Sequence, residues 1–263
     1  MKSWDDEGTK FKDLFNFLTR SISNNENEID EETLNSTVSK FGRGTFGTYL
    51  PMHSNFTSAT RPWGIYLFPQ FILSRANFLH RKIGNSLGLK QKEIQYAYSY
   101  AIYRHLLFHH QVERFSTKHE ILTKQVNYKK YRTNVYNKTS NTEGWFEEAL
   151  AEISVLRSTH ISNNINISKK DFNKLYEFDL TFMPPGNQDY HCDNFGGPDE
   201  AHKILASQII QCNINVDPSR STSICTVNAN EFGIPLKKIP IYKVIYDLPI
   251  SIKSPRQVVE DNY

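Results

Sequence analysis

The segment from Lys90 to Thr123 contains neither proline nor glycine. These two residues are the strongest breakers of a regular helix, so their absence over this length favours one continuous helix. Apolar and aromatic residues, followed by a histidine, recur on one face of it: Ile94, Ala97, Tyr98, Ala101, Ile102 and His105. The pattern predicts a long helix over 90–123, and several candidate site residues lie on it.

Further helices are expected on both sides of this long helix. Apolar spacing, caps and breakers predict them at 8–22, 70–83, 142–157 and from Pro198 onward. Thr142 is the expected cap of the third, because a threonine side chain can accept a hydrogen bond from a free backbone N–H in the first turn.

Strands are expected in three places. The aromatic run 63–68 lies between two prolines, the glycine-rich turn 42–48 leads into an extended segment, and the tail 234–252 alternates prolines with β-branched residues. Two other segments lack a clear period: 23–32 is expected to be a polar linker, and 126–142 an irregular or β-rich insertion.

This order of elements predicts an α+β fold, with a helical core, a small sheet and a β-rich C-terminal region. We expect an N-terminal helix and linker at 1–40, a core at 41–160 and a C-terminal α/β extension at 161–263. A chain of 263 residues can bury such a core without disulfides, and an aromatic content of 13% supplements a hydrophobic content of 38%.

Composition excludes several classes of protein. The cysteines, Cys192, Cys212 and Cys225, are odd in number and show no CxxC spacing, which argues against a disulfide framework and a cysteine-type zinc site. The N-terminus is acidic where a signal peptide is basic, and no apolar run approaches the ~18 residues that span a bilayer, so a cytoplasmic protein without a membrane segment is expected. A net charge of +3 does not by itself indicate a nucleic-acid partner.

The long helix carries an unusual group of metal-ligating residue types. His105, His109 and Glu113 follow one another at intervals of four, and His110 lies three residues before Glu113. Residues four apart lie on the same side of a helix, and imidazole and carboxylate are ligands that zinc, iron and manganese favour. This group predicts a site for a divalent transition metal, with zinc as the leading candidate.

A second helix can close that site from another direction. Within the segment 144–152, Glu148 and Glu152 are four apart, and Leu150 and Ala151 provide a small apolar surface for close helix packing. The alternative is that Glu147, Glu148 and Glu152 form an ordinary solvated helical face.

The order of these elements resembles the zincin metallopeptidases of the gluzincin type. A strand like 63–68, a helix with paired histidines and a helix reading E-x-x-A-E occur in that order over about residues 60–157. The resemblance implies a zincin-like core at 41–160 in which His105, His109 and Glu148 bind zinc. It also implies that Glu152 orients one of the histidines.

The chain departs from the HExxH pattern of that family at its general base. Leu106 occupies the glutamate position after His105, and leucine cannot accept a proton. A second register aligns the pattern with residues 109–113, where His110 would be the catalytic base and Glu113 a metal ligand, since imidazole can act as a base. Both registers remain open at this point.

The resemblance implies a zinc-dependent hydrolase acting on peptide bonds of a protein or peptide substrate. One alternative is a non-catalytic binding protein that retains the metal site, which Leu106 favours. Another is a metal-dependent nucleic-acid-processing protein that uses the basic and aromatic segment 128–136, although a solvated loop is the favoured interpretation of that segment. The loop residues His191, Cys192 and Asp193 are a further, isolated candidate for metal ligation.

Overall fold

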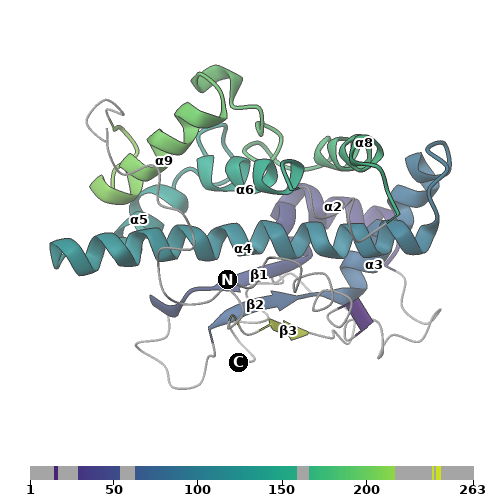
Figure 1. The fold of residues 1–263 in the computed structure, drawn as a ribbon, viewed down its shortest axis with the longest axis horizontal. Coiled ribbons are helices and arrows are strands. Elements are labelled where there is room, and N and C mark those ends of the chain that lie inside the picture. Colours follow the sequence, from purple (N-terminus) through teal and green to yellow (C-terminus); the bar gives the residue numbers. More distant parts are fainter. Residues whose placement is uncertain are drawn as a thin grey trace, which may run out of the picture.

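The computed structural model describes residues 15–16, 29–53, 63–158, 166–216, 239 and 241–243. The long helix α4, Gln91–Thr123, crosses the molecule, with the strands along one side and helices α6 (Phe146–Leu156) and α9 (Pro198–Gln211) on the other (Figure 1). The described part of the chain is therefore mostly helical, with one small sheet.

Helix α4 confirms the predicted helix at 90–123. It begins after Lys90, whose backbone N–H donates to Glu93 at 2.9 Å, and ends where Lys124 adopts a left-handed conformation (φ 57°). Its middle, around residues 105–113, is buried on several sides. Side chains on opposite faces of this one helix can therefore belong to different buried clusters.

The sheet has three strands in the order β1–β2–β3: Gly47–Leu50, Gly64–Leu67 and Ile241–Lys243. β1 and β2 are antiparallel, with Gly47 opposite Leu67, whereas β2 and β3 are parallel. The strands predicted after the turn 42–48 and at 63–68 are thereby confirmed. Of the tail 234–252, β3 and residue 239 are described and the rest lies outside the described residues, so a β-rich C-terminal region is not shown.

A glycine brings the sheet close to α4. A Cβ atom on Gly47 would lie 2.6 Å from the Tyr66 carbonyl oxygen and 2.8 Å from Leu106 Cδ1. A side chain does not fit there without a shift of the strand or the helix. Gly47 therefore lets β1 pass directly beside the part of α4 that carries the histidines.

The remaining helices surround this centre. In chain order they are α2 (Glu31–Phe41), α3 (Pro69–Leu79), α5 (Tyr128–Tyr131) and α8 (Lys169–Leu180), in addition to α6 and α9. Short 3₁₀ turns lie at η1 (Gly42–Thr45) and η5 (Asp193–Phe195), and π-helical turns at η3 (His80–Gly84) and η4 (Arg132–Tyr136). The helices predicted at 70–83 and from Pro198 are confirmed, whereas most of the predicted helix 8–22 lies outside the described residues.

Two local expectations were wrong. The segment 126–142 is not β-rich: it contains α5 and the π-helical turn η4. Thr142 does not cap the following helix, because α6 begins later, at Phe146, and the Thr142 hydroxyl donates to the Thr139 carbonyl instead. None of the helices in the described ranges has both the length and the apolar character needed to cross a bilayer.

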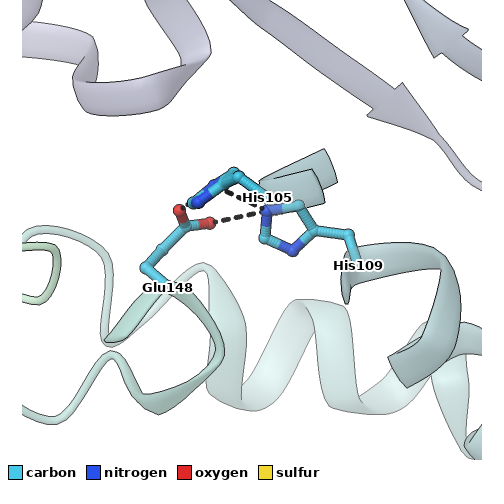
Figure 2. Close-up of side chains that lie close together, drawn as sticks. All are labelled: His105, His109 and Glu148. Atoms are coloured by element: carbon cyan, nitrogen blue, oxygen red, sulfur yellow. Dashed lines mark hydrogen bonds and ion pairs between the residues drawn. The ribbon is translucent and has the colours of Figure 1, made fainter. Parts of the chain in front are cut away.

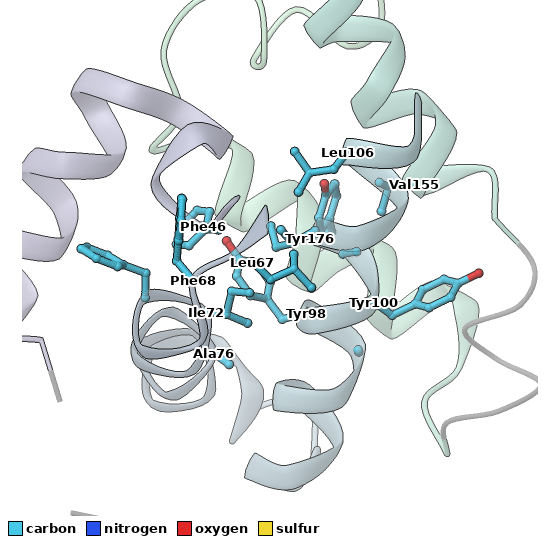
Figure 3. Packing of buried hydrophobic residues seen from close by; sticks show 14 of the residues in the cluster. Phe46, Leu67, Phe68, Ile72, Ala76, Tyr98, Tyr100, Leu106, Val155 and Tyr176 are labelled. Atoms are coloured by element: carbon cyan, nitrogen blue, oxygen red, sulfur yellow. The ribbon is translucent and has the colours of Figure 1, made fainter. Parts of the chain in front are cut away.

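Two apolar clusters meet at α4. The first joins the sheet to α2, α3, α4 and α8, and Figure 3 shows part of it, with Phe46, Leu67, Tyr98, Leu106 and Tyr176 among its members. The second joins the later half of α4 to α5, α6 and α9, and includes Phe108, Val112 and Leu150. Because Leu106 and Phe108 belong to different clusters, the histidines beside them lie at the boundary between the two.

Candidate metal centre

His105, His109 and Glu148 converge on one point between α4 and α6. Their ligand atoms all lie within 4.8 Å of one another, and the three residues are buried (Figure 2). The two imidazole Nε2 atoms are 3.2 Å apart. One carboxylate oxygen of Glu148, Oε2, lies 3.1 Å from His105 Nε2, and the other, Oε1, lies 3.4 Å from His109 Nε2. Two helices thus supply the mixed nitrogen and oxygen donors that the sequence predicted.

The spacing of these donors fits a divalent transition metal. Metal–nitrogen bonds of about 2.0–2.1 Å in a tetrahedral site separate neighbouring ligand atoms by roughly 3.3 Å. The three measured separations are close to this value, although they also suit direct hydrogen bonds between the side chains. A divalent ion held by these three residues would keep a position open for water or a substrate, as in catalytic zinc sites.

Each histidine has a carboxylate behind it. The distance from His109 Nδ1 to Glu147 Oε1 is 2.7 Å, and the other Glu147 oxygen accepts a hydrogen bond from the Tyr131 hydroxyl at 2.7 Å. His105 Nδ1 lies 3.5 Å from Glu152 Oε1 and makes no hydrogen bond in the described part of the chain. A proton held on Nδ1 by a carboxylate directs the Nε2 lone pair toward a metal, so this arrangement is typical of zinc-binding histidines.

The three glutamates of α6 are not a solvated helical face. Glu147, Glu148 and Glu152 are only 1%, 5% and 0% exposed. Charges are rarely buried unless they are paired or bind a metal, because removing them from water is costly. The alternative that these residues simply face solvent is therefore wrong.

Burial and the mutual charges of these groups shift the pKa values of His105, Glu148 and Glu152. Burial alone would raise the pKa of Glu152, but the Arg43 guanidinium and His105 hold it at about 2. Burial would likewise raise the pKa of Glu148, yet His109 and His105 lower it well below its usual value. The pKa of His105 is raised to about 9, because the charges of Glu152 and Glu148 outweigh the effect of burial. Protons and a metal ion would thus compete for the same nitrogen.

A buried network holds Glu152 in place. It accepts hydrogen bonds from Arg43 Nε at 2.9 Å, from the Tyr176 hydroxyl at 2.5 Å and from Asn187 Nδ2 at 2.8 Å. These partners come from three different parts of the chain. The position of Glu152 beside His105 is therefore fixed by tertiary structure and not by α6 alone.

The His105–His109–Glu148 triad opens into a cavity of about 450 Å³. Gly47, Thr48 and Tyr49 of β1 form one wall, and η4 and the turn before α6 contribute others. Leu106 also lines the cavity and is 3% exposed, so an apolar side chain stands there at the position after His105. A volume of this size is within the range of small-molecule binding sites.

His110 and Glu113 lie in a different cluster. The Tyr49 hydroxyl is 2.7 Å from His110 Nδ1 and donates to Glu113, whose carboxylate also accepts a hydrogen bond from the backbone N–H of His53 at 2.9 Å. His110 stacks on Trp63, and burial lowers its pKa to about 4. The structure thus places His110 close to Glu113, and both outside the triad.

Helix geometry explains this separation. At 3.6 residues per turn, residues eight apart on a helix differ in direction by about 80° and in height by about 12 Å. Glu113 is eight residues after His105 and therefore cannot join it on one ion without bending α4. Of the two registers considered, the triad corresponds to the one with His105 and His109.

Several residues around the site were not predicted to belong to it. Tyr136 donates to Glu148 at 2.5 Å, and Arg43 and Tyr131 support the carboxylates behind the histidines. Tyrosine and arginine are common in ordinary surfaces and cores, and none of the three stands at a regular helical spacing from the histidines and glutamates of the site. The loop cysteine Cys192, in contrast, is buried in the apolar cluster formed with α6 and α9 and does not belong to the triad.

Comparison with known protein families, with curated proteins and with solved structures found no match to this chain. The buried triad in a mostly helical fold is consistent with the resemblance to zincins. The functional argument therefore rests on the geometry of the site.

Proposed function

We propose that His105, His109 and Glu148 bind a zinc ion, or another divalent transition metal, and that the protein uses it to hydrolyse peptide bonds. The convergence of two imidazoles and one carboxylate at the end of a cavity carries this proposal. Such an ion polarises a carbonyl group and lowers the pKa of a water molecule toward about 7.

The protein supplies orientation and a place for the substrate. Glu147 accepts a hydrogen bond from His109, Glu152 lies 3.5 Å behind His105, and the Tyr136 hydroxyl donates to Glu148. In the described sheet, β1 pairs with β2 on one side and borders the cavity with Gly47, Thr48 and Tyr49. An extended peptide can pair with such a strand and place one of its carbonyl groups near the triad.

A second candidate function is metal-dependent binding without catalysis. The observation that favours it is Leu106, which places an apolar side chain where the resembling peptidases have their base. The cavity and the triad would then capture a peptide or another carbonyl ligand without cleaving it.

The first test is the metal content of the purified protein. We expect one equivalent of zinc by elemental analysis, and its loss in the double variant His105→Ala/His109→Ala. The matched control is His191→Ala, which changes an exposed histidine away from the triad and should retain the metal. Absence of any bound transition metal after loading and dialysis would contradict both candidate functions.

The second test separates catalysis from binding. The zinc-loaded protein is incubated with a mixed peptide library, and products are identified by mass spectrometry. New peptide termini that disappear in the double variant support hydrolysis. The binding function is supported instead by a protein that holds stoichiometric zinc and cleaves no peptide. The library peptides must at the same time be retained by the protein in a pull-down at the concentration used.

A further inference from the structure

We propose that the cavity recognises an anionic group, a carboxylate or a phosphate, through Arg132 and Lys40. This inference rests on the proposed function, because it specifies which ligands that same cavity accepts. Both cations line the cavity, and they come from different elements, η4 and the end of α2.

Arg132 lies beside the triad, and the N–H groups of its guanidinium donate no hydrogen bond to the described residues. Its guanidinium carbon lies 3.5 Å from the centre of the Tyr136 ring, and the Tyr136 hydroxyl donates to Glu148. Its nearest carboxylate is Glu147, at 3.9 Å, which is too far for a hydrogen bond. The guanidinium makes no hydrogen bond to the described residues, so its planar set of donors remains available to a bidentate anion.

Lys40 provides a second positive charge. Its ammonium group lies 5.0 Å from the centre of the neighbouring Phe41 ring, and it forms no ion pair with the described residues. Lysine is a mobile point charge on a long stem, so it can approach an anion that the more rigid Arg132 side chain has oriented.

Apart from the metal ion at the triad, the balance of charge in the cavity is unfavourable for a positively charged peptide group. Among the described residues that line it, Glu148 is the one carboxylate, and its two oxygens already face His105 and His109. A divalent ion at the triad would add further positive charge. Three exposed polar side chains complete the wall: Asn137, Ser140 and Asn141. Their amides and hydroxyl can donate to additional oxygens of an anion.

The experiment measures the binding of four short peptides to the full-length, zinc-loaded protein by isothermal titration calorimetry. The reference is an alanine tripeptide blocked at both ends. The other three add one anion each: a free terminal carboxylate, a central aspartate or a central phosphoserine. We expect at least one anionic peptide to bind about tenfold more tightly than the reference, or better, and the best of the three identifies the source of the anion.

Charge-removing variants then assign this preference to the two cations. Arg132→Gln and Lys40→Gln should each reduce the preference by about tenfold or abolish it, whereas Arg132→Lys should retain part of it. The matched control is Lys129→Gln, which removes one exposed charge from the adjacent helix outside the cavity. Circular dichroism verifies that the variants are folded. Unchanged preference in both Arg132→Gln and Lys40→Gln overturns the proposal.

The variant His105→Ala/His109→Ala separates this inference from the proposed function. We expect it to lose zinc but to keep the preference for anionic peptides, since Arg132 and Lys40 do not ligate the ion. If zinc does not bind even to the parent protein while the preference persists, the proposed function fails and the anion site stands. If the preference disappears with the histidines, the anion binds the metal directly and the proposed role of the two cations is wrong.

Discussion

Glu147 lies behind the triad and accepts a hydrogen bond from His109, so the proposed metal site predicts that it influences metal affinity. Replacing it by glutamine keeps the size of the side chain but removes the charge that stabilises a proton on His109 Nδ1. We expect Glu147→Gln to weaken zinc binding by about 10- to 100-fold, as measured by competition with a chelating dye. The control is the exposed Glu143→Gln, which should leave affinity unchanged. Equal affinities of the two variants would show that Glu147 does not orient the imidazole.

Leu106 is the residue at which the chain departs from the HExxH pattern. Replacing it tests whether a general base at this position increases hydrolysis. Leu106→Glu introduces a carboxylate beside the triad, within the cavity. A positioned general base contributes about 10²–10⁴-fold to a hydrolytic rate, so we expect peptide cleavage to appear or to increase by about this factor.

Leu106→Gln is the matched control for that change. It has nearly the same size and polarity as the glutamate variant but cannot accept the proton. Both variants must retain zinc for the comparison to hold. Equal cleavage rates for the two would contradict the assignment of this position to a missing base.

The residues of the triad could be predicted because they lie on two regular helices at recognisable spacings. His105 and His109 are one helical turn apart, and Glu148 stands in the E-x-x-A-E segment. The carboxylate behind His105, Glu152, could also be predicted from that segment, whereas the residues that hold the carboxylates, such as Arg43 and Tyr131, could not, because their residue types have many other uses. The intervals of four that place Glu113 in line with His105 ignore the 80° drift that accumulates over eight helical residues, and the group that converges in the described part of the chain is His105, His109 and Glu148.

At the scale of elements, α4 was the easiest to predict and the segment 126–142 the hardest. Helix α4 is long and has no breaker, so local propensity and burial agree. α5 and η4 are short, and tertiary contacts such as the hydrogen bonds from Tyr131 to Glu147 and from Tyr136 to Glu148 hold them. Short elements stabilised by distant partners leave little periodic signal in their own sequence.

His53, three residues after the end of β1, is joined to α4 by an ionic contact whose strength depends on pH. His53 Nδ1 lies 2.6 Å from Glu113, and its Nε2 lies 2.8 Å from Glu120. Burial would lower the pKa of His53, but these two carboxylates raise it above 6.5 overall. Burial would raise the pKa values of Glu113 and Glu120, yet hydrogen bonds to them lower both below 4.5.

The sign of the pH dependence follows from these shifts. Stability from His53 is fully present below its unfolded pKa of 6.5 and is lost as pH rises through the higher folded value. Stability from the two glutamates is present above 4.5 and is lost as pH falls. We therefore expect His53→Gln to be most destabilising between about pH 5 and 6, and less so near pH 9.

Urea unfolding of the parent and His53→Gln in the presence of a chelator measures this difference. The exposed His191→Gln serves as the control for a histidine without such partners. A destabilisation that is constant across this pH range, or greatest at alkaline pH, would show that the ionic contact does not contribute in the folded protein.

At the scale of the whole molecule, a buried ionic network connects the triad to distant parts of the fold. Arg43 follows α2, is 1% exposed, and binds both Glu152 of α6 and Asp179 of α8. Asp179 also pairs with Arg75 of α3 at 2.6 Å. Three helices that are far apart in sequence, α3, α6 and α8, and the turn η1 are therefore tied together directly behind His105.

Removing Arg43 should destabilise the entire fold. Arg43→Met leaves two buried carboxylates with less compensation, and breaking a buried pair in this way costs about 3–5 kcal/mol. We expect a large decrease in the urea midpoint, together with weaker zinc binding, because Glu152 loses a partner. The control is Arg157→Met, whose side chain is 61% exposed and whose pairing with Asp199 should matter little. Similar midpoints for both variants would contradict a structural role for the network.

The turn between η4 and α6 offers a consequence for protein engineering. Its side chains at Asn137, Ser140 and Asn141 are exposed and border the cavity, whereas the candidate ligand atoms are anchored in α4 and α6. Randomising these three positions should therefore yield libraries of variants that differ in which ligands enter the cavity, while the triad itself is unaltered. The entrance of the cavity and its candidate ligands can thus be varied independently of each other.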